Sequence, residues 1–577
     1  MTATITANFK LAQELDMITK GLKFTGLFSF KNYSSSSTER SASYNHYYMS
    51  SYDPSSMEYK ITRIGDEQST ALTNDGSRNG DRKMYFQAIL DYNRIFKEVH
   101  DLNIMFLYNQ EQYDINGPTT LFSSLPQRKQ GVAGRVSYSY DGRYYIEGNF
   151  GYNGSENFAK GHRFGFFPSI AVGYNISNEK FWQPIKPVIS NLKIRGSWGL
   201  VGNDATNAGR FAYMEDLVLG GSDSYTTGIR QDTYYSGPSW NRYFNPDLTW
   251  EVGEKINLGL DLQLFNDFNL TFDIFREKRR DIFMTRENSI PEIVGTGETK
   301  ITSNNGEMEN KGLDLAIDYN KQITKDFFLS FKSTLTFARN KVLKMDEPPY
   351  FEYPGLSDVG HPLGTYWGYV ADGLFPDQET IDNSPRQDLG YTPQPGDIKY
   401  VNQPNAKGEY DNVINSNDRV AIGHPYDPEL VYGFGPSMKW KNWDFSFFFQ
   451  GVARTSFMMY GMHPFGTTSI KNMLQFVADD HWSVDNPNPN AAYPRLTKDS
   501  NGNNDQYSTY WLRNAAFLKL KNAEIGYTYK GMRFYLSGVN LLTFSPFKHW
   551  DPEMGGGNGL YYPTQRVFNI GFQMTIQ

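Results

Sequence analysis

The sequence predicts an all-β protein, folded as an antiparallel transmembrane β-barrel. Three observations carry this prediction: long segments in which apolar and polar residues alternate, connections of sharply unequal length, and a polar composition that is nevertheless rich in aromatic residues. Side chains of a strand point to opposite faces in turn, so strict alternation marks a strand with one apolar and one polar face. In a membrane barrel the apolar face meets lipid and the polar face meets the lumen.

The alternating segments recur along the whole chain. In "FFLSFKSTLTFA", Phe327, Leu329 and Phe331 share one face, while Ser330 and Lys332 share the other. Similar alternation occurs in 5–10, 192–198, 256–264, 270–274, 443–449 and 568–576. Many of these segments reach about ten residues, which is the length that a tilted strand needs to cross a bilayer. We count roughly sixteen such strands.

The connections between these strands fall into two classes. Short connections are found at 265–269, 321–326 and 529–533, and long polar ones at 33–80, 202–248, 341–427 and 454–512. Transmembrane barrels have short turns at one rim and longer loops at the other, so this asymmetry favours a membrane barrel. The alternative is a large soluble β fold, such as an adhesin or a propeller.

The composition agrees with a barrel and excludes several other classes. Of the 577 residues, 39% are hydrophobic and 16% are aromatic, and no apolar run has the length of a transmembrane helix. The chain has no cysteine, which excludes disulfides and a thiol nucleophile. The net charge is −7 and no Lys/Arg-rich run occurs, so we expect no nucleic-acid partner.

The sequence does not predict an enzyme. Its eight histidines include no HExxH spacing, and the chain contains neither a GxSxG elbow nor a P-loop. Nothing pairs a nucleophile with a base. The expectation is therefore a protein without catalytic residues and without a cofactor, apart from one candidate metal site.

That candidate is a calcium site in the segment 396–423. Asp411, Asn415 and Asp418 have the spacing of the oxygen ligands in the second half of an EF-hand loop, with an apolar residue at Ile414 between them. Oxygen ligands suit a hard cation such as calcium. However, Asn412 stands where that loop has Gly, and the first half of the loop is interrupted. The alternative is a polar Asn/Asp turn.

Two long connections are rich in aromatic residues. The segments "YYSGPSWNRYF" (234–244) and "GTYWGYVADGLF" (364–375) could stack on sugar rings. The alternatives are that these residues form the cores of loops or anchor the protein at the membrane interface.

Several stretches resemble one known family. They include "FNPDLTWEVGEKINLGLDLQLFNDFNLTFDIFREKRRDIF" (244–283) and "STYWLRNAAFLKLKNAEIGYTY" (508–529). The others are 167–182, 189–204, 304–319, 493–496 and 534–544. Their order and spacing resemble the C-terminal barrel of the SusC/RagA family, the TonB-linked outer-membrane transporters of Bacteroidetes. The resemblance covers nearly the whole chain except the long loops.

The resemblance implies how an intact relative works. Such a protein forms a barrel of about 22 strands in the outer membrane, closed by an N-terminal plug. A TonB box before the plug receives energy from the TonB–ExbB–ExbD complex, and a SusD-like surface lipoprotein covers the barrel as a lid. The imported substrates are oligosaccharides or peptides.

On this comparison, residues 1–577 are expected to be a partial barrel with long extracellular loops. We find no signal peptide, TonB box or plug in the chain, and our strand count is about six below that of the family. Ile576 and Gln577 also replace the aromatic residue that commonly ends such barrels. Unpaired backbone groups at lipid depth each cost several kcal/mol, so we expect that the chain alone does not insert as a closed barrel.

The expected function is nutrient import by gated passage rather than catalysis. Polar residues on the lumen face would line the path, and the candidates are Lys193, Arg195, Asp261, Asp273, Asp318 and Lys332. The alternative for these residues is that they hydrate the lumen and form ion pairs in the barrel wall. The alternative for the whole protein is a surface receptor or adhesin that binds without transport.

Overall fold

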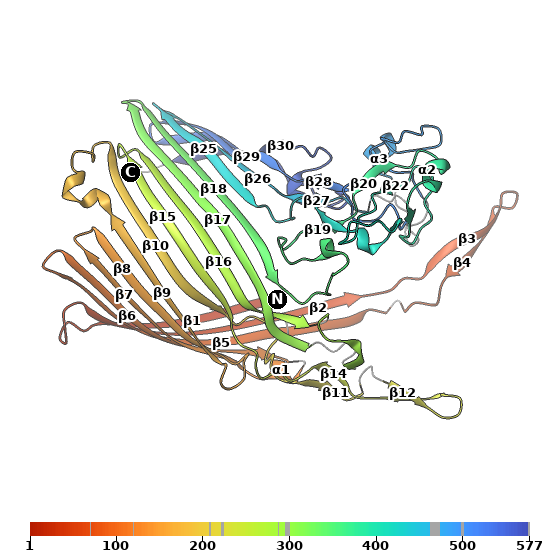
Figure 1. The fold of residues 1–577 in the computed structure, drawn as a ribbon, viewed down its shortest axis with the longest axis horizontal. Coiled ribbons are helices and arrows are strands. Elements are labelled where there is room, and N and C mark those ends of the chain that lie inside the picture. The colour runs from red at the N-terminus through yellow and green to blue at the C-terminus, as the bar shows by residue number, and fades with distance from the viewer. Residues whose placement is uncertain are drawn as a thin grey trace.

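The computed structural model describes residues 1–577 except 70, 119, 207–208, 221–223, 287, 295–300, 462–472, 498–500 and 575–577. Its main feature is one large, curved antiparallel sheet, which we call the wall (Figure 1). In the described residues the wall has 17 strands. They are β1 (Thr2–Glu14), β2 (Leu22–Ser41), β5 (Thr73–Phe96), β6 (His100–Asn116), β7 (Gln127–Tyr140), β8 (Tyr144–Ser155), β9 (Phe164–Asn175), β10 (Ile189–Asn203), β15 (Glu251–Leu264), β16 (Phe268–Arg286), β17 (Ile301–Thr324), β18 (Phe327–Lys344), β25 (Leu430–Trp440), β26 (Trp443–Ala453), β29 (Phe517–Tyr529), β30 (Met532–Phe544) and β31 (Val567–Met574).

The wall is a simple up-and-down sheet. Each strand pairs in antiparallel fashion with the next wall strand along the chain, and β1 and β31 are the outermost strands. This arrangement confirms the predicted all-β antiparallel architecture, and the observed number of strands is close to the expected one.

The connections separate onto two rims, as the sequence predicts. The turns 97–99, 141–143, 265–267, 325–326, 441–442 and 530–531 join wall strands at one rim. The connections 42–72, 204–250, 345–429, 454–516 and 545–566 are all at the other rim, and they extend to the right in Figure 1. We call these the short-turn rim and the long-loop rim.

One predicted loop is wrong. Much of 33–80, expected as a polar loop, is strand: β2 and β5 pair as far as Ser41 and Thr73, and a further hairpin pairs β3 (His46–Asp53) with β4 (Glu58–Ile64). The segment lacks alternation because the hairpin projects from the rim into water on both faces. Backbone pairing and hydroxyl contacts such as Ser37 Oγ to Ser77 Oγ (2.7 Å) hold it instead.

The outer face of the wall is an exposed apolar belt. Leu90, Phe106 and Phe150 are 42%, 50% and 37% exposed, and they lie in one row across β5, β6 and β8. On β7 the row contains Gly134, where a Cβ would lie 2.3 Å from the Phe150 ring, so the ring covers this glycine. A row of exposed apolar side chains across many strands is the surface that a bilayer covers.

The long-loop rim carries a folded unit, the rim domain, made of the described parts of 345–429, 454–516 and 545–566 (Figure 1). Side chains from all three connections share one hydrophobic core, for example Tyr400, Trp511 and Phe547. Its elements are η4 (Pro354–Leu356), β19 (Tyr366–Gly368), β20 (Ala371–Leu374), α2 (Gln378–Asp382), β21 (Arg386–Gln387), β22 (Ile398–Tyr400), β23 (Val413–Ile414), η5 (Ser416–Asp418), β24 (Val420–Ile422), β27 (Ser456–Met458), α3 (Gln475–Asp479), β28 (Leu512–Asn514) and η6 (Pro552–Met554).

The remaining elements are short. They are α1 (Leu121–Ser124), η1 (Ile176–Asn178), η2 (Lys180–Trp182), β11 (Asp216–Val218), β12 (Ser224–Thr227), β13 (Thr233–Ser236), β14 (Ser239–Arg242) and η3 (Glu292–Val294). Among the described residues, no helix has the length and apolarity needed to cross a bilayer.

Candidate functional site

The inner face of the wall carries ion pairs between neighbouring strands. Arg195 on β10 donates through Nη1 and Nη2 to both carboxylate oxygens of Asp273 on β16, at 2.7 and 2.6 Å. Its Nε also lies 3.2 Å from Oδ2 of Asp261 on β15, the strand between them. One guanidinium therefore joins three strands through charge-assisted hydrogen bonds.

The other predicted lumen residues are also engaged within the wall. Lys332 lies 4.0 Å from Asp318, its direct neighbour across β18 and β17. The Lys193 ammonium lies 4.5 Å from the centre of the Tyr145 ring. The structure thus brings the six candidates into wall contacts, and contact with a ligand stays a prediction for each of them.

A second ion-paired cluster was missed at the sequence level. Arg533 on β30 pairs with Asp444 on β26 and Glu524 on β29. Arg533 and Asp444 are 89 residues apart, and only the register of three strands brings them together. The spacing of these three residues along the sequence therefore does not predict the cluster.

The rim domain is organised around a buried carboxylate. Asp397 is fully buried, and its Oδ1 accepts hydrogen bonds from Arg495 Nε (2.7 Å), Asn504 Nδ2 (2.8 Å) and Asn501 Nδ2 (3.0 Å). Its Oδ2 accepts from the backbone N–H of Gln394 at 2.8 Å. A buried charge is tolerated when it is paired and fully hydrogen-bonded, as it is here.

The same network continues along β22. Ile398 N donates to Asn504 Oδ1 (2.9 Å), and Tyr400 N donates to Gln387 Oε1 (2.7 Å). The Tyr400 hydroxyl donates to the carbonyl of Asn503 at 2.8 Å, and burial raises the pKa of this tyrosine. These contacts fix the segment 503–504 and the strand β21 against β22.

Gly396 allows a tryptophan to pack over the turn before Asp397. Its φ is 90°, a left-handed value that favours glycine, and a Cβ there would lie 2.2 Å from the Trp482 ring. The indole therefore packs directly on the backbone at this glycine. Trp482 is 7% exposed, so the indole is itself buried where it packs on this turn.

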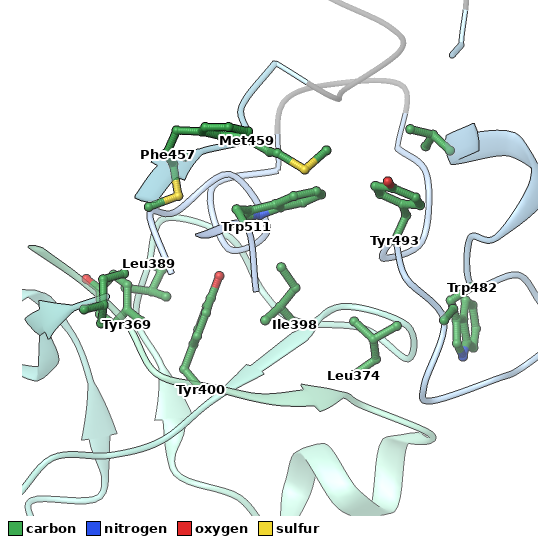
Figure 2. Packing of buried hydrophobic residues seen from close by; sticks show 14 of the residues in the cluster. Tyr369, Leu374, Leu389, Ile398, Tyr400, Phe457, Met459, Trp482, Tyr493 and Trp511 are labelled. Atoms are coloured by element: carbon green, nitrogen blue, oxygen red, sulfur yellow. The ribbon is translucent and has the colours of Figure 1, made fainter. Parts of the chain in front are cut away.

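Aromatic side chains fill the centre of the rim domain (Figure 2). Tyr493 and Trp511 lie with ring centres 6.2 Å apart, and Trp511 Nε1 donates to the carbonyl of Asn504 at 2.7 Å. Figure 2 shows Trp511 close to Met459, whose backbone N–H donates to the Trp511 carbonyl at 3.0 Å. The aromatic core and the polar network thus share the segment 501–511.

A cavity of about 280 Å³ lies beside this shared segment. Its apolar side includes Met459, Tyr493 and Trp511, and its polar side includes Arg495 and Asn504. Tyr460 also lines it and is 51% exposed, so the cavity reaches the surface. A concave site with a largely apolar lining and a few fixed polar groups is the usual form of a small-molecule binding site.

Two buried charged residues, each in two ion pairs, join the rim domain to the wall. Lys519 on β29 is fully buried and contacts Asp551 (2.7 Å) and Glu553 (2.5 Å) of the rim domain. Glu429, just before β25, is bound by Arg339 of β18 (3.1 Å) and by Arg454 after β26 (2.7 Å). The domain is therefore attached at fixed points.

The two aromatic segments behave differently. In 364–375, Tyr369 and Phe375 are 3% and 1% exposed, so they belong to buried packing. In 234–244, Tyr234 is 62% exposed and Tyr235 stacks on Tyr225 at 5.2 Å in an exposed hairpin. Contact of either segment with sugar rings stays a prediction.

Comparison with known proteins assigns the wall to a family. The family model described as "TonB dependent receptor-like, beta-barrel" matches residues 2–541. The chain belongs to the TonB-dependent receptor β-barrel family. TonB-dependent receptors are outer-membrane proteins, and this agrees with the exposed apolar belt.

Several curated TonB-dependent receptors are similar in sequence. "TonB-dependent receptor P3" of Formosa agariphila is 27% identical over 478 residues, which are 77% of this chain and 45% of that protein. "TonB-dependent receptor SusC" of Bacteroides thetaiotaomicron is 29% identical over 468 residues, or 76% of this chain and 43% of that protein. The chain therefore spans about half the length of these receptors or less. The SusC match supports the SusC/RagA resemblance.

A solved structure agrees on the fold. A chain in "Structure of the RagAB peptide transporter" superposes with a TM-score of 0.72 at 19% identity, covering 99% of this chain and 62% of that chain. The wall and the rim domain of this TonB-dependent receptor barrel thus follow a known architecture.

The calcium site stays a prediction in this receptor barrel. Asp418 accepts backbone N–H groups from Gln403 (2.7 Å) and Asn415 (2.8 Å), and Asp411 and Asn415 each accept one from two residues further on. Asn412 has a φ of 59°, the backbone form that Gly would supply. The described residues contain no group of three or more His, Cys, Asp or Glu side chains suited to a metal. In this structure the segment is a capped polar turn.

The prediction for the last two residues is outside the described part of the chain. Ile576 and Gln577, expected to stand in place of a terminal aromatic residue, lie beyond the last described position. The alternation that predicts the final strand is observed in β31, where Phe568 and Ile570 are 76% and 88% exposed.

Proposed function

We propose that this chain forms the C-terminal part of the barrel of a TonB-dependent importer of the SusC type, which carries oligosaccharides or peptides across the outer membrane. The observation that supports this most directly is the combination of an apolar outer belt, an ion-paired inner face and a folded rim domain on one wall. A passage for polar solutes needs a polar inner surface and a way to capture its cargo at one end.

In this proposal the chain performs no chemistry on its substrate. The rim domain captures the cargo, and a SusD-like surface lipoprotein covers the long-loop rim. Energy comes from TonB–ExbB–ExbD in the complete protein. The cell is a Gram-negative bacterium of the Bacteroidetes type, in line with the organisms of the similar receptors.

A comparison of strains tests this proposal. The parent strain, a strain without this gene and a strain without TonB are given a panel of fluorescent oligosaccharides and peptides. We expect at least one solute to be taken up by the parent alone. Solutes that bind at the surface of the TonB-deficient strain, with no gene-dependent uptake in any strain, would instead identify a receptor or adhesin.

A further inference from the structure

The short-turn rim carries lysine at one recurring position. In the described part of the chain, four of its six turns of two or three residues begin with a lysine, and these are Lys97, Lys325, Lys441 and Lys530. Lys97, Lys441 and Lys530 have φ of 50°, 51° and 48°, a left-handed form that Asn, Asp and Gly adopt more easily. The backbone of these turns therefore does not explain why lysine stands there.

An aromatic row crosses the wall close to two of these turns. Its members, each the direct cross-strand neighbour of the next, are Trp440 on β25, Trp443 on β26, Tyr527 on β29 and Phe534 on β30. Phe534 and Leu536, two residues apart on one face of β30, are 51% and 54% exposed, so the row belongs to the apolar belt. Aromatic rows at the edge of such a belt lie at the level of the lipid head groups.

The two lysines nearest this row extend toward aromatic rings. Lys441 Nζ lies 5.8 Å from the centre of the Trp440 ring, and Lys530 Nζ lies 5.4 Å from the centre of the Tyr529 ring. Tyr529 is on the same face of β29 as the row, because it is two residues from Tyr527. Both ammonium groups are therefore on the lipid side of the rim. Their turns are two strand spacings apart, or about 10 Å.

The acidic groups of this region do not neutralise the two lysines. Strands β25, β26, β29 and β30 contain two acidic residues, Asp444 and Glu524, and both lie on the lumen face, where they pair with Arg533. In the neighbouring turn, Lys325 and Asp326 have opposite charges. The lipid side of this part of the rim therefore has a net positive charge, next to aromatic rings.

We propose that Lys441 and Lys530 bind the phosphate groups of an anionic phospholipid in the inner leaflet of the outer membrane. Short turns of membrane barrels face the periplasm, so this rim meets the inner leaflet. Lysine binds phosphate as a compact charge, and lysines beside an anionic lipid surface strengthen binding to it. Phosphatidylethanolamine has an ammonium group that the lysines repel, whereas phosphatidylglycerol has none. The inference requires the barrel in its membrane, and it does not depend on the cargo.

Two substitutions remove these charges and keep the turns. Lys441→Asn and Lys530→Asn each introduce a residue that adopts the left-handed form more readily than lysine does, so the fold is retained. The matched control is Lys439→Gln, which removes a lysine of the same rim that lies on the lumen face, opposite Asp444. Heat-modifiable electrophoresis establishes that each variant is folded.

Lipid binding is measured by native mass spectrometry. The protein is purified in neutral detergent from outer membranes of the bacterium that encodes it, and it is titrated with phosphatidylglycerol or with phosphatidylethanolamine of the same acyl chains. We expect the parent to bind phosphatidylglycerol more tightly than phosphatidylethanolamine. Phosphatidylglycerol should bind about fivefold more weakly to each Asn variant and equally well to Lys439→Gln.

Three results would overturn the inference. The parent could bind the two lipids equally, the Asn variants could keep the parental preference, or Lys439→Gln could weaken binding as much as they do. The third result would assign the effect to the net charge of the barrel. Uptake of cargo is measured separately in cells, so failure of the lipid site and failure of the importer are distinguishable.

Discussion

Arg495 Nε donates to Oδ1 of the buried Asp397 over 2.7 Å and thereby joins the two longest connections of the chain. The two residues are 98 positions apart, one in 345–429 and the other in 454–516. Asn501 and Asn504 donate to the same oxygen. The two longest loops of this barrel therefore belong to one packed domain, and this ion pair is one of the contacts that join them.

Removal of the carboxylate should loosen the rim domain. Asp397→Ala leaves the Arg495 guanidinium without its charge partner, which costs about 3–5 kcal/mol for a buried pair. Hydrogen exchange read by mass spectrometry should show faster exchange at 386–400 and 501–511. The control Asp388→Ala, whose carboxylate is 58% exposed, should change stability by at most about 0.5 kcal/mol. Equal exchange in the two variants would contradict this role of Asp397.

Gly396 should be far less replaceable than a neighbouring glycine. Gly396→Ala adds two costs, a left-handed backbone at a residue with a side chain and a clash with the Trp482 ring. Gly390→Ala adds only the backbone cost, because Gly390 also has a left-handed φ (77°) but no atom lies within 4 Å of where its Cβ would be. We expect Gly390→Ala to cost about 1–2 kcal/mol and Gly396→Ala clearly more. Urea titration followed by tryptophan fluorescence measures both. Similar midpoints would mean that Trp482 does not pack over Gly396.

His549 should make the rim domain sensitive to acid. Its ring stacks on Phe476 with centres 4.3 Å apart, its Nε2 lies 3.3 Å from the Tyr493 hydroxyl, and burial together with the charge of Arg513 lowers its pKa. Because the folded state prefers neutral histidine, the contribution of His549 to stability is fully present above the unfolded pKa of about 6.5, and it is lost as the pH falls from there through the lower pKa of the folded state.

Calorimetric melting of the rim domain at about pH 8 and about pH 5.5 measures this effect. The midpoint should fall at the lower pH, and it should fall less in His549→Phe, which keeps an aromatic ring but cannot be protonated. An equal fall in both proteins would assign the acid sensitivity to other groups.

Arg195 should matter for the wall rather than for the cargo. Arg195→Ala leaves Asp261 and Asp273 close together without their shared cation, so the wall should unfold at a lower temperature. Lys332→Ala should have little effect, because that ammonium is 70% exposed and 4.0 Å from its partner. Heat-modifiable electrophoresis measures unfolding, and uptake is normalised to surface level. A loss of normalised uptake in Arg195→Ala would make Arg195 a ligand contact.

The wall could be predicted from sequence because a lipid face and a lumen face impose a period of two on each strand. That period is directly visible in β18 and β31. The hairpin within 33–80 could not be predicted, because both of its faces meet water and no period marks it.

The rim domain also could not be predicted from the sequence. Its ion pair spans 98 residues, and the bond from Ala371 N to Thr509 Oγ1 spans 138. Such contacts depend on how three loops fold over one rim, and no local spacing of residues predicts them. For this reason the sequence does not predict a role for Asp397 or Arg495. The alternation of each strand does place Arg195 and Asp273 on the lumen face, but their ion pair follows only from the register of the strands.

The central claim is that the wall separates lipid from an aqueous lumen, and cysteine labelling tests it most directly. The chain has no native cysteine, so an introduced cysteine is the one thiol of this chain that a maleimide can label. On β30, Leu536 is 54% exposed on the apolar belt and pairs with Ile570, whereas its neighbour Ser537 points to the other face.

Leu536→Cys and Ser537→Cys are compared in outer membranes of the bacterium that encodes the chain. We predict that a lipid-soluble maleimide labels position 536 and a water-soluble maleimide labels position 537. Equal labelling of both positions by the water-soluble reagent would contradict the account.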